Sequence, residues 1–464
     1  MKYRRVLLII LLAFWTAPLS GMRVLVRWDL DTAPPSGLPG ISGLAVPWGW
    51  GKAALVKSAA DAGYRVYYLV APTELEEMTP TLPGSPLSGV IILSGDLRTA
   101  LKSRLQARPE IPASIEIAAA WETGHFPRIL SNSVQNKDGV LQVAAASSQP
   151  WIESNHAAAA ILRHVHPTQS YLHYSWPEGA GQPASVDDYL LAVSEAGASG
   201  VDLVLPLGPD FQRSLALDQP EARHRWRQIA TCIDTYSNRS PGKLQPPGNL
   251  AVITEDFEIW YDLLKMLSRY NVPFRLIPRR ELNNLAAPPL NLVLFLATPD
   301  PSETEKLESL LDDGVSAIVG LEAKEKLRWR GKRTAVFESD DAASYRIGKG
   351  QLVELYGSGT DPNALALDVR RILGKEHRPI QLWNALTVLT ALYPQGQSEA
   401  VLYLTNYALS PQVVQVRVAG TFSKVQCVWP EKGESAALKF ETDNGFTEVT
   451  VPDVKVGAIV TLSR

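Results

Sequence analysis

Acidic and tryptophan side chains recur at the ends of short apolar runs in the first half of the chain. The acidic residues in these positions are Asp29, Asp31, Asp96, Glu122, Glu153, Glu178 and Asp210, and the tryptophans are Trp28, Trp121, Trp151 and Trp176. Hydrolysis of a glycosidic bond needs two carboxyl groups, about 5 Å or about 6.5–9.5 Å apart, one as acid and one as nucleophile or base. Broad indole faces can stack against sugar rings and wall an apolar cleft. These residue types therefore point to acid/base chemistry on a carbohydrate.

Glu122 is the first candidate for the general acid. It directly follows Trp121 and lies near His125 in the sequence, and a carboxyl group that loses solvation against an indole has its pKa raised towards that of a useful acid. Glu178 is the first candidate for its catalytic partner, ahead of Glu153 and Asp29. The residues expected to bind the substrate are Trp28, Trp121, Trp151, Trp176, His125 and Glu153.

A structural explanation exists for each of these carboxylates. Glu153 and Ser154 stand at a predicted helix start, where an acidic residue favours the helix dipole and Ser caps free amides. Glu122 could equally be a solvated loop carboxylate or a helix-start residue, and Glu178 lies in the flexible-looking segment PEGAGQP. The candidate residues are spread along the sequence and do not form a recognised motif.

Parallel strands would bring these residues together, because ligands of a barrel bind where the carboxyl ends of its strands open into loops. Between 22 and 238, apolar runs alternate with helical stretches, which is typical of parallel βα units. The predicted strands are 23–29, 65–71, 89–96, 115–122, 141–147, 170–176 and 201–207. Seven runs favour a (β/α) barrel with one strand missing or unrecognised, and a doubly wound open sheet is the alternative.

Two further domains are predicted after the linker 237–249, which is rich in Pro, Gly and Ser. Residues 249–376 show a second α/β pattern and are expected to form a flavodoxin-like domain. Residues 377–464 alternate apolar and polar positions between turn residues, which predicts a small antiparallel β-sandwich. The expected fold class is thus α/β, with a (β/α) barrel-like domain, a flavodoxin-like domain and a β-sandwich.

Residues 1–21 are predicted to be a signal peptide. A basic start is followed by ten apolar residues and then small residues, a pattern too short for a membrane span. An uncleaved anchor is the alternative. Cleavage would leave a secreted or periplasmic protein with no membrane association.

Charge and cysteine content exclude several classes of protein. Loss of three basic residues with the signal moves the formal net charge from −3 to −6, and no basic stripe is available for nucleic acid. Only two cysteines, Cys232 and Cys427, are present, so no disulfide framework or cysteine metal site is expected. The sequence also lacks G-x-S-x-G, H-E-x-x-H, P-loop and dinucleotide motifs. We therefore expect no metal and no cofactor.

The order of domains resembles that of secreted multidomain glycoside hydrolases, in particular the bacterial β-galactosidase type. The segments SYLHYSW and DDYLLAVSEAGASGVDLVLPL look like late barrel units, and VLYLTNYA with VQVRVAG looks like the terminal sandwich. The resemblance implies an amidotransferase-like domain at 249–376, which contains no cysteine nucleophile and would instead offer a surface for homo-oligomer formation. Such hydrolases carry Asn-Glu after strand four and Glu after strand seven, whereas this chain has Trp121-Glu122 and LPLGPD.

The leading hypothesis is a secreted glycoside hydrolase-like protein with a carbohydrate substrate or ligand at the barrel mouth. The competing hypothesis is a non-catalytic carbohydrate-binding or cell-envelope scaffold protein, including a catalytically degenerate relative. A periplasmic binding protein with two lobes is a weaker third possibility, because a terminal sandwich and a single linker do not suit a two-lobe hinge.

Overall fold

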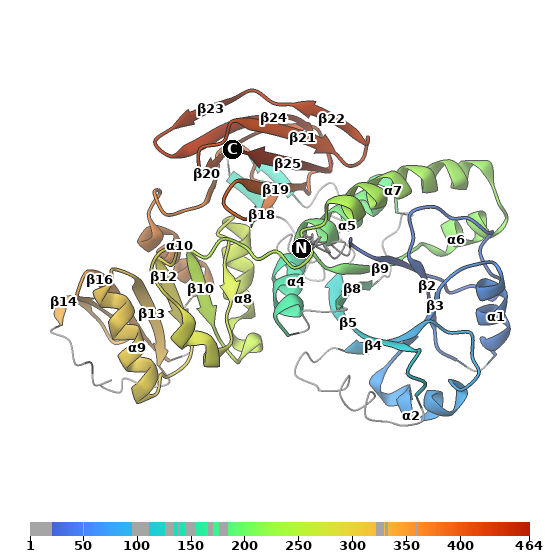
Figure 1. Ribbon diagram of the computed structural model, residues 1–464, viewed down its shortest axis with the longest axis horizontal. Helices are drawn as coiled ribbons and strands as arrows, with labels where there is room; N and C mark the ends of the chain where they lie inside the picture. The colour runs from blue at the N-terminus through green and yellow to red at the C-terminus, as the bar shows by residue number, and fades with distance from the viewer. Residues whose placement is uncertain are drawn as a thin grey trace, which may run out of the picture.

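The protein is represented by a computed structural model in which three domains lie around a common centre, with the barrel on the right of Figure 1 and the C-terminal sandwich at the top. The described residues are 21–49, 51–94, 111–125, 134–137, 140–143, 154–165, 170–175, 184–321, 329, 333–357 and 361–464. Within them, the side chains of 94, 121–125, 134–137, 140–143, 154, 170 and 175 are not described. In this part of the chain no helix has the length and apolar character needed to cross a membrane.

The first domain is a closed barrel of seven parallel strands. In barrel order they are β1 (Val24–Arg27), β2 (Gly43–Pro47), β3 (Val66–Val70), β4 (Gly89–Ser94), β5 (Glu116–His125), β8 (Ser170–Ser175) and β9 (Asp202–Pro206). Pairing of β1 with β9 closes the sheet. The predicted barrel is confirmed, and the open-sheet alternative is wrong because no edge remains in this sheet.

One predicted barrel strand is wrong and one was missed. The run 141–147 gives only β7 (Val140–Val143), which pairs with β6 (Val134–Lys137) in a separate two-stranded sheet. A continuous apolar run does not distinguish a strand covered on both faces from a hairpin. The missed strand is β2, five residues within a stretch broken by Gly and Pro. Trp121 and Glu122 consequently lie on the fifth strand of the barrel and not the fourth.

Strand residues alternate between the inside and the outside of the barrel. Leu25, Ile91 and Val204 belong to a buried interior cluster, whereas Val24 and Val26 face outwards and pack in the larger core with the helices. The α-helices in the described part of this domain are α1 (Ala53–Asp61), α2 (Leu75–Met78), α4 (Ser154–Val165), α5 (Val186–Ser199), α6 (Pro209–Ala216) and α7 (Pro220–Arg239). Because strand side chains alternate between the two faces of the sheet, only every second residue of a strand can reach the barrel axis.

Helix α5 shows how the sequence sets the ends of these helices. Ser185 caps its start by accepting a hydrogen bond from the Asp188 amide at 3.3 Å, and the Asp188 carboxylate accepts from the Ser185 amide at 2.7 Å. Gly200 ends the helix in a left-handed conformation with φ of 69°. Almost the whole helix is buried because the sandwich covers its outer side.

The second domain is a seven-stranded sheet. Its strands, in spatial order, are β11 (Arg275–Leu276), β10 (Leu250–Ile253), β12 (Leu292–Phe295), β13 (Ser316–Leu321), β16 (Gly350–Tyr356), β15 (Ala342–Ile347) and β14 (Thr334–Glu338). The first five are parallel in the order 2-1-3-4-5, which is the flavodoxin-like order. The α-helices are α8 (Phe257–Arg269), α9 (Pro301–Asp312) and α10 (Pro362–Leu373), with Asp256, Asp300 and Asp361 as their N-caps.

The third domain consists of two antiparallel sheets. One contains β17 (Ile380–Leu382), β20 (Gln412–Ala419), β24 (Phe446–Val454) and β23 (Phe440–Asp443). The other contains β18 (Val388–Gln395), β19 (Glu399–Asn406), β25 (Gly457–Ser463), β21 (Lys424–Trp429) and β22 (Glu434–Ala437). Apolar residues of both sheets share one buried core, as a sandwich requires.

Candidate functional site

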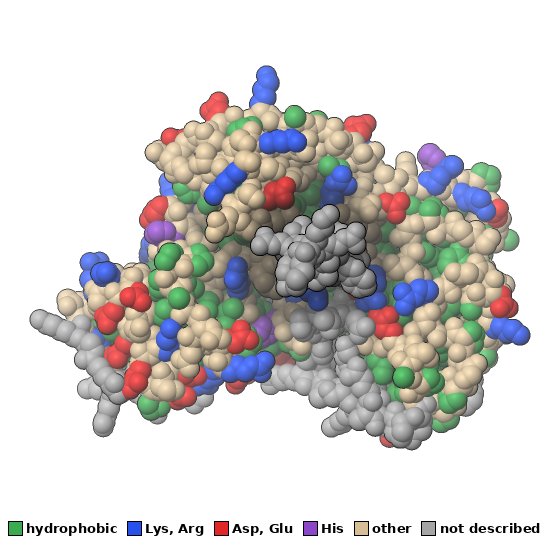
Figure 2. Space-filling model, in the orientation of Figure 1, with side chains coloured by type: hydrophobic (Ala, Val, Ile, Leu, Met, Phe, Trp, Pro, Cys, Tyr) green, Lys and Arg blue, Asp and Glu red, His purple; other side chains and the backbone are tan. Residues whose placement is uncertain are grey.

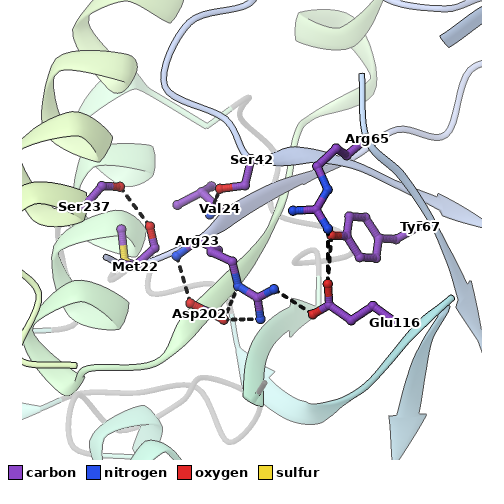
Figure 3. Close-up of polar contacts among 9 residues, drawn as sticks. All are labelled: Met22, Arg23, Val24, Ser42, Arg65, Tyr67, Glu116, Asp202 and Ser237. Carbon is purple, nitrogen blue, oxygen red and sulfur yellow. Dashed lines mark hydrogen bonds and ion pairs between the residues drawn. The ribbon is translucent and has the colours of Figure 1, made fainter. Parts of the chain in front are cut away.

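The N-terminal end of the barrel interior is filled by an ion network. Arg23, which directly precedes β1, pairs with Glu116 at 2.6 Å and with Asp202 at 2.8 Å (Figure 3). Tyr67 donates to Glu116 at 3.1 Å, and Arg65 lies 3.3 Å from the same carboxylate. These partners lie on or directly before four different strands and satisfy one another, which identifies this end of the barrel as a structural element.

An apolar layer lies between that network and the opposite end of the barrel. Its members are Leu25, Ala45, Tyr67, Leu69, Ile91, Ala118, Ala120, Tyr171 and Val204. All are nearly or fully buried, so the barrel is a packed core and not a pore, as is usual for this fold. Within the barrel, a ligand can therefore be expected only at the carboxyl ends of the strands.

Asp29 lies at that end, just after β1. Arg27 pairs with its Oδ1 at 2.9 Å, and Gln212 of α6 donates to its Oδ2 at 3.1 Å. The Asp29 amide in turn donates to the Gln212 side-chain oxygen at 2.9 Å. The Asp29 side chain is 42% exposed. Its carboxylate is thus held in a fixed position and still reaches solvent.

Two further charges extend this end of the barrel. Lys52, the residue before α1, contacts the Asp29 carbonyl oxygen at 3.2 Å and the Asp31 carboxylate at 2.5 Å. Asp31 is largely exposed. We call Arg27, Asp29, Asp31, Lys52, His173 and Gln212 the mouth residues.

His173 on β8 brings a neutral imidazole to the mouth. Burial and the nearby Arg27 charge lower the pKa of His173 to about 4, although Asp29 opposes the shift. Its Nε2 makes a long contact of 3.5 Å with Arg27 Nη1. Because a guanidinium can only donate, Nε2 is assigned as the acceptor and Nδ1 as the N–H. That Nδ1 is buried and has no hydrogen-bond partner within the described ranges.

The backbone of Glu122 lies beside His173. In the pairing of β5 with β8, Trp121 stands opposite Leu172 and Gly124 opposite Tyr174. Glu122 and Thr123 therefore form a two-residue bulge against the single residue His173. Bulges of this kind often lie next to active sites, where they redirect a side chain.

The structure brings together only some of the predicted site residues. Asp29 is a mouth residue, and Trp121, Glu122 and His125 are placed by their backbone only, on β5. The positions of Trp151, Glu153, Trp176 and Glu178 fall outside the described residues. Their roles, and the side-chain roles of the three β5 residues, stay predictions.

Trp28 requires a correction, because its side chain offers no open face for a sugar ring. Its side chain points to the outside of the barrel, like those of Val24 and Val26, and is fully buried against the helices. Its indole N–H donates to the Thr32 carbonyl at 2.7 Å.

Sequence reasoning missed Arg27, His173, Gln212 and Lys52. The alternation along the strands could have identified two of them. Arg27 lies two positions after Leu25, and His173 lies two positions after Tyr171, so both side chains point to the inside of the barrel. Gln212 and Lys52 lie on or next to helices, and nothing local marks them. Among the residues that the structure describes, no group of three His, Cys, Asp or Glu side chains is arranged to hold a metal ion.

Comparison with known proteins supports the architecture alone. No protein-family model matches the chain, and no curated protein sequence matches it. Among solved structures, the α-L-fucosidase isoenzyme 2 from Paenibacillus thiaminolyticus is similar, with a TM-score of 0.56, 10% identity, and coverage of 96% of this chain and 99% of that chain. A GH42 β-galactosidase from G. stearothermophilus has a TM-score of 0.46 and 10% identity, with coverage of 89% and 67%.

The predicted glycoside hydrolase-like architecture is thereby confirmed as a fold. The fucosidase likeness extends over nearly the full length of both chains, so it includes the barrel and the domains that follow it. At this identity the likeness says nothing about individual residues.

Proposed function

We propose that the barrel mouth binds a carbohydrate and hydrolyses a glycosidic bond in it. The observation that carries this proposal is the arrangement at the carboxyl ends of β1, β5 and β8. There a fixed, solvent-reaching carboxylate and an unfilled imidazole N–H lie beside a bulge that contains Glu122. Hydrolases of this barrel type place their chemistry at this end.

Glu122 is the proposed acid. It would protonate the leaving oxygen as the bond between the anomeric carbon and that oxygen breaks, and the second carboxylate would attack the anomeric carbon or take a proton from the attacking water. Among the described carboxylates Asp29 suits the second role, because Arg27 and Gln212 fix its orientation. Glu178 remains the other candidate for that role.

His173 and the ring of mouth charges would bind sugar hydroxyl groups. A neutral imidazole can donate to a hydroxyl without the cost of burying another charge, and ionised groups such as Asp31 and Lys52 make strong hydrogen bonds to hydroxyls. The formal net charge of −3 and the lack of basic clusters support a carbohydrate over a nucleic acid as ligand. The apolar segment in residues 1–21 supports secretion or a periplasmic location.

A screen of chromogenic glycosides with the purified protein tests this function. We expect turnover of at least one glycoside, and a loss of roughly 10²–10⁴-fold in kcat/KM for Glu122→Gln, as for removal of a general acid. Asp29→Asn should cause a comparable loss. The matched control is Asp368→Asn, a partly exposed carboxylate on α10 of the second domain that pairs with Arg371 at 2.8 Å, which should leave kcat/KM unchanged.

Two outcomes would contradict the proposal. An unchanged rate in Glu122→Gln would remove Glu122 from the mechanism. Binding of a glycan without turnover of any glycoside would instead support the non-catalytic carbohydrate-binding protein.

A further inference from the structure

A cavity lies where the three domains meet. The space-filling view shows that the surface of the molecule is hollowed below the sandwich, between the other two domains (Figure 2). The cavity has a volume of about 420 Å³ and is lined by α4 of the barrel domain, by the linker at Gln245 and Pro246, by the segment from α8 to β11, and by β18 of the sandwich. This volume is within the usual range for small-molecule sites, which favour domain interfaces. The cavity shares no residue with the mouth.

Arg275 on β11 is a cation without a counter-ion in this wall. Its Nε donates to the Pro246 carbonyl at 2.5 Å, and no carboxylate pairs with it among the residues that the structure describes. The side chain is half-buried, and burial lowers the pKa of Arg275 below its usual value. Partial burial removes water from this charged group at a cost in free energy, and no opposite charge among the described side chains offsets that cost. An anion bound next to the guanidinium would therefore stabilise it strongly.

Arg163 adds a second guanidinium to the same wall. It donates to the Ser199 carbonyl at 3.1 Å and to the Tyr393 hydroxyl at 2.9 Å, and it lies over the Tyr393 ring at 5.1 Å. These partners are neutral. Among the described residues of the wall, Glu281 is the one acidic residue, and it is exposed. The cavity is therefore positive in a chain whose formal net charge is −3.

Neutral polar atoms in the wall are also incompletely paired. His156 Nε2 and Ser199 Oγ are buried and have no hydrogen-bond partner in the described part of the chain. Burial lowers the pKa of His156 to about 4, so the imidazole is uncharged at neutral pH. Buried polar atoms of native proteins are nearly always paired, and each exception calls for an explanation.

We propose that this junction cavity binds a small hydroxylated organic anion whose carboxylate or phosphate pairs with Arg275. The planar fork of an arginine matches both oxyanions through two parallel hydrogen bonds. Arg163 supplies further positive potential, and the unpaired wall atoms are suited to hydroxyl groups of the ligand. Because all three domains line the cavity, the ligand stabilises their arrangement.

Isothermal titration calorimetry on the full chain tests the site, at constant ionic strength and pH 7. The probes are sodium glucuronate for a carboxylate, glucose 6-phosphate for a phosphate, and glucose as the uncharged comparison. We expect one of the two anions to bind and glucose not to bind. Arg275→Gln should weaken the anion by roughly ten- to hundredfold, and Arg275→Lys should weaken it less.

Arg378→Gln is the matched control. Arg378 is also partly buried and donates its Nε to a backbone carbonyl, that of Gly374 at 3.2 Å, but it does not line the cavity. This variant should bind the anion like the wild type. Thermal unfolding of each variant without ligand establishes that it is folded, and Arg275→Lys keeps the test valid if Arg275→Gln does not fold.

Three results would overturn the proposal. The first is that neither anion gives a heat of binding at concentrations on the order of 10 mM. The second is that glucose binds with the same affinity as the anions. The third is that both Arg275 variants bind the anion with unchanged affinity.

Discussion

The two ends of one barrel use the same residue types for different purposes. At the N-terminal end, Arg23 joins Asp202 and Glu116, whose side chains are 16% and 13% exposed. At the mouth, Arg27 pairs with Asp29, which is 42% exposed. Arg23 directly precedes β1 and Arg27 is its last residue, two strand repeats further on, so both arginines point to the inside of the barrel. Burial and the number of partners distinguish a structural cluster from a candidate site.

The physical reason lies in how completely the charges are satisfied. Although burial alone would lower it, the carboxylates of Asp202 and Glu116 raise the pKa of Arg23, so this arginine stays charged at any practical pH. At the mouth, His173 keeps an N–H without a partner among the described residues, and Asp29 keeps access to solvent. A site that acts on a ligand must leave such groups available, whereas a structural cluster leaves none.

The largest effect is expected for Arg23→Met. The change leaves Asp202 without its cation in a mostly buried position, and removal of one partner from such a pair typically lowers the free energy of unfolding by about 3 kcal/mol or more. Urea unfolding followed by circular dichroism measures it.

Arg27→Met is the control, because Arg27 also points to the inside of the barrel. Its ion pair is partly exposed, so the free energy of unfolding should change by about 1 kcal/mol or less. Equal losses in the two variants would break the distinction between the ends.

A fourth carboxylate, Glu195, differs from the other three, because no arginine among the described residues pairs with it and its side chain is closed off from solvent. It is fully buried on α5 and accepts hydrogen bonds from Asn155 at 2.7 Å, from Tyr174 at 2.7 Å and from Tyr407 of the sandwich. Burial raises the pKa of Glu195 to about 7, although these three donors oppose the shift. Because no arginine stabilises the charged form of Glu195 among the described residues, burial determines the direction in which its pKa shifts.

This shift makes stability depend on pH. Between about 4.5, the ordinary value, and about 7, the folded protein keeps a proton that the unfolded chain has lost. The contribution of Glu195 to the free energy of unfolding therefore falls as pH rises through this window, by on the order of 3 kcal/mol, and is constant above it.

Glu195→Gln should remove that dependence. Urea unfolding of both proteins at pH 4.5, 5.5, 6.5 and 7.5 gives a difference curve in which the wild type loses stability relative to the variant as pH rises. A flat difference curve would mean that Glu195 titrates as it does in the unfolded chain.

A smaller effect than that of Glu195 is expected for Gln212→Leu at the mouth. This nearly buried residue holds Asp29 and also donates to the Leu207 carbonyl at 2.9 Å, so its loss should lower the free energy of unfolding by about 1–2 kcal/mol. On any glycoside that is turned over, KM or kcat should worsen as Asp29 loses its fixed position. Gln228→Leu, on the exposed side of α7, should change stability by about 0.5 kcal/mol or less. An unchanged activity in Gln212→Leu would show that Asp29 needs no support.

Much of the fold could be predicted because strand and helix periods are local properties. Six of the seven barrel strands, the flavodoxin-like domain and the sandwich were predicted from apolar runs and their turns. The short β2 could not be distinguished from a loop, and 141–147 could not be distinguished from a barrel strand, because five to seven residues carry too little pattern.

The candidate site was less predictable because its contacts are not local. Asp29 was expected at the strand end, but its partner Gln212 lies 183 residues away, and the cation at the other end of the barrel, Arg23, meets Asp202 at a separation of 179. Trp28 was mistaken for a stacking platform because only the parity of β1, combined with the closed sheet, shows that it faces the helices.

Paired substitutions at the two ends of the barrel test the central claim most directly. Asp29→Asn and Asp202→Asn each remove one charge from an inward carboxylate, and each variant is measured for its free energy of unfolding and for kcat/KM on the best glycoside of the screen. We expect Asp29→Asn to lose turnover with a stability change of about 1 kcal/mol or less, and Asp202→Asn to lose about 3 kcal/mol of stability while its folded fraction keeps its turnover. Full turnover in Asp29→Asn, or a loss of turnover in folded Asp202→Asn, would contradict the central claim.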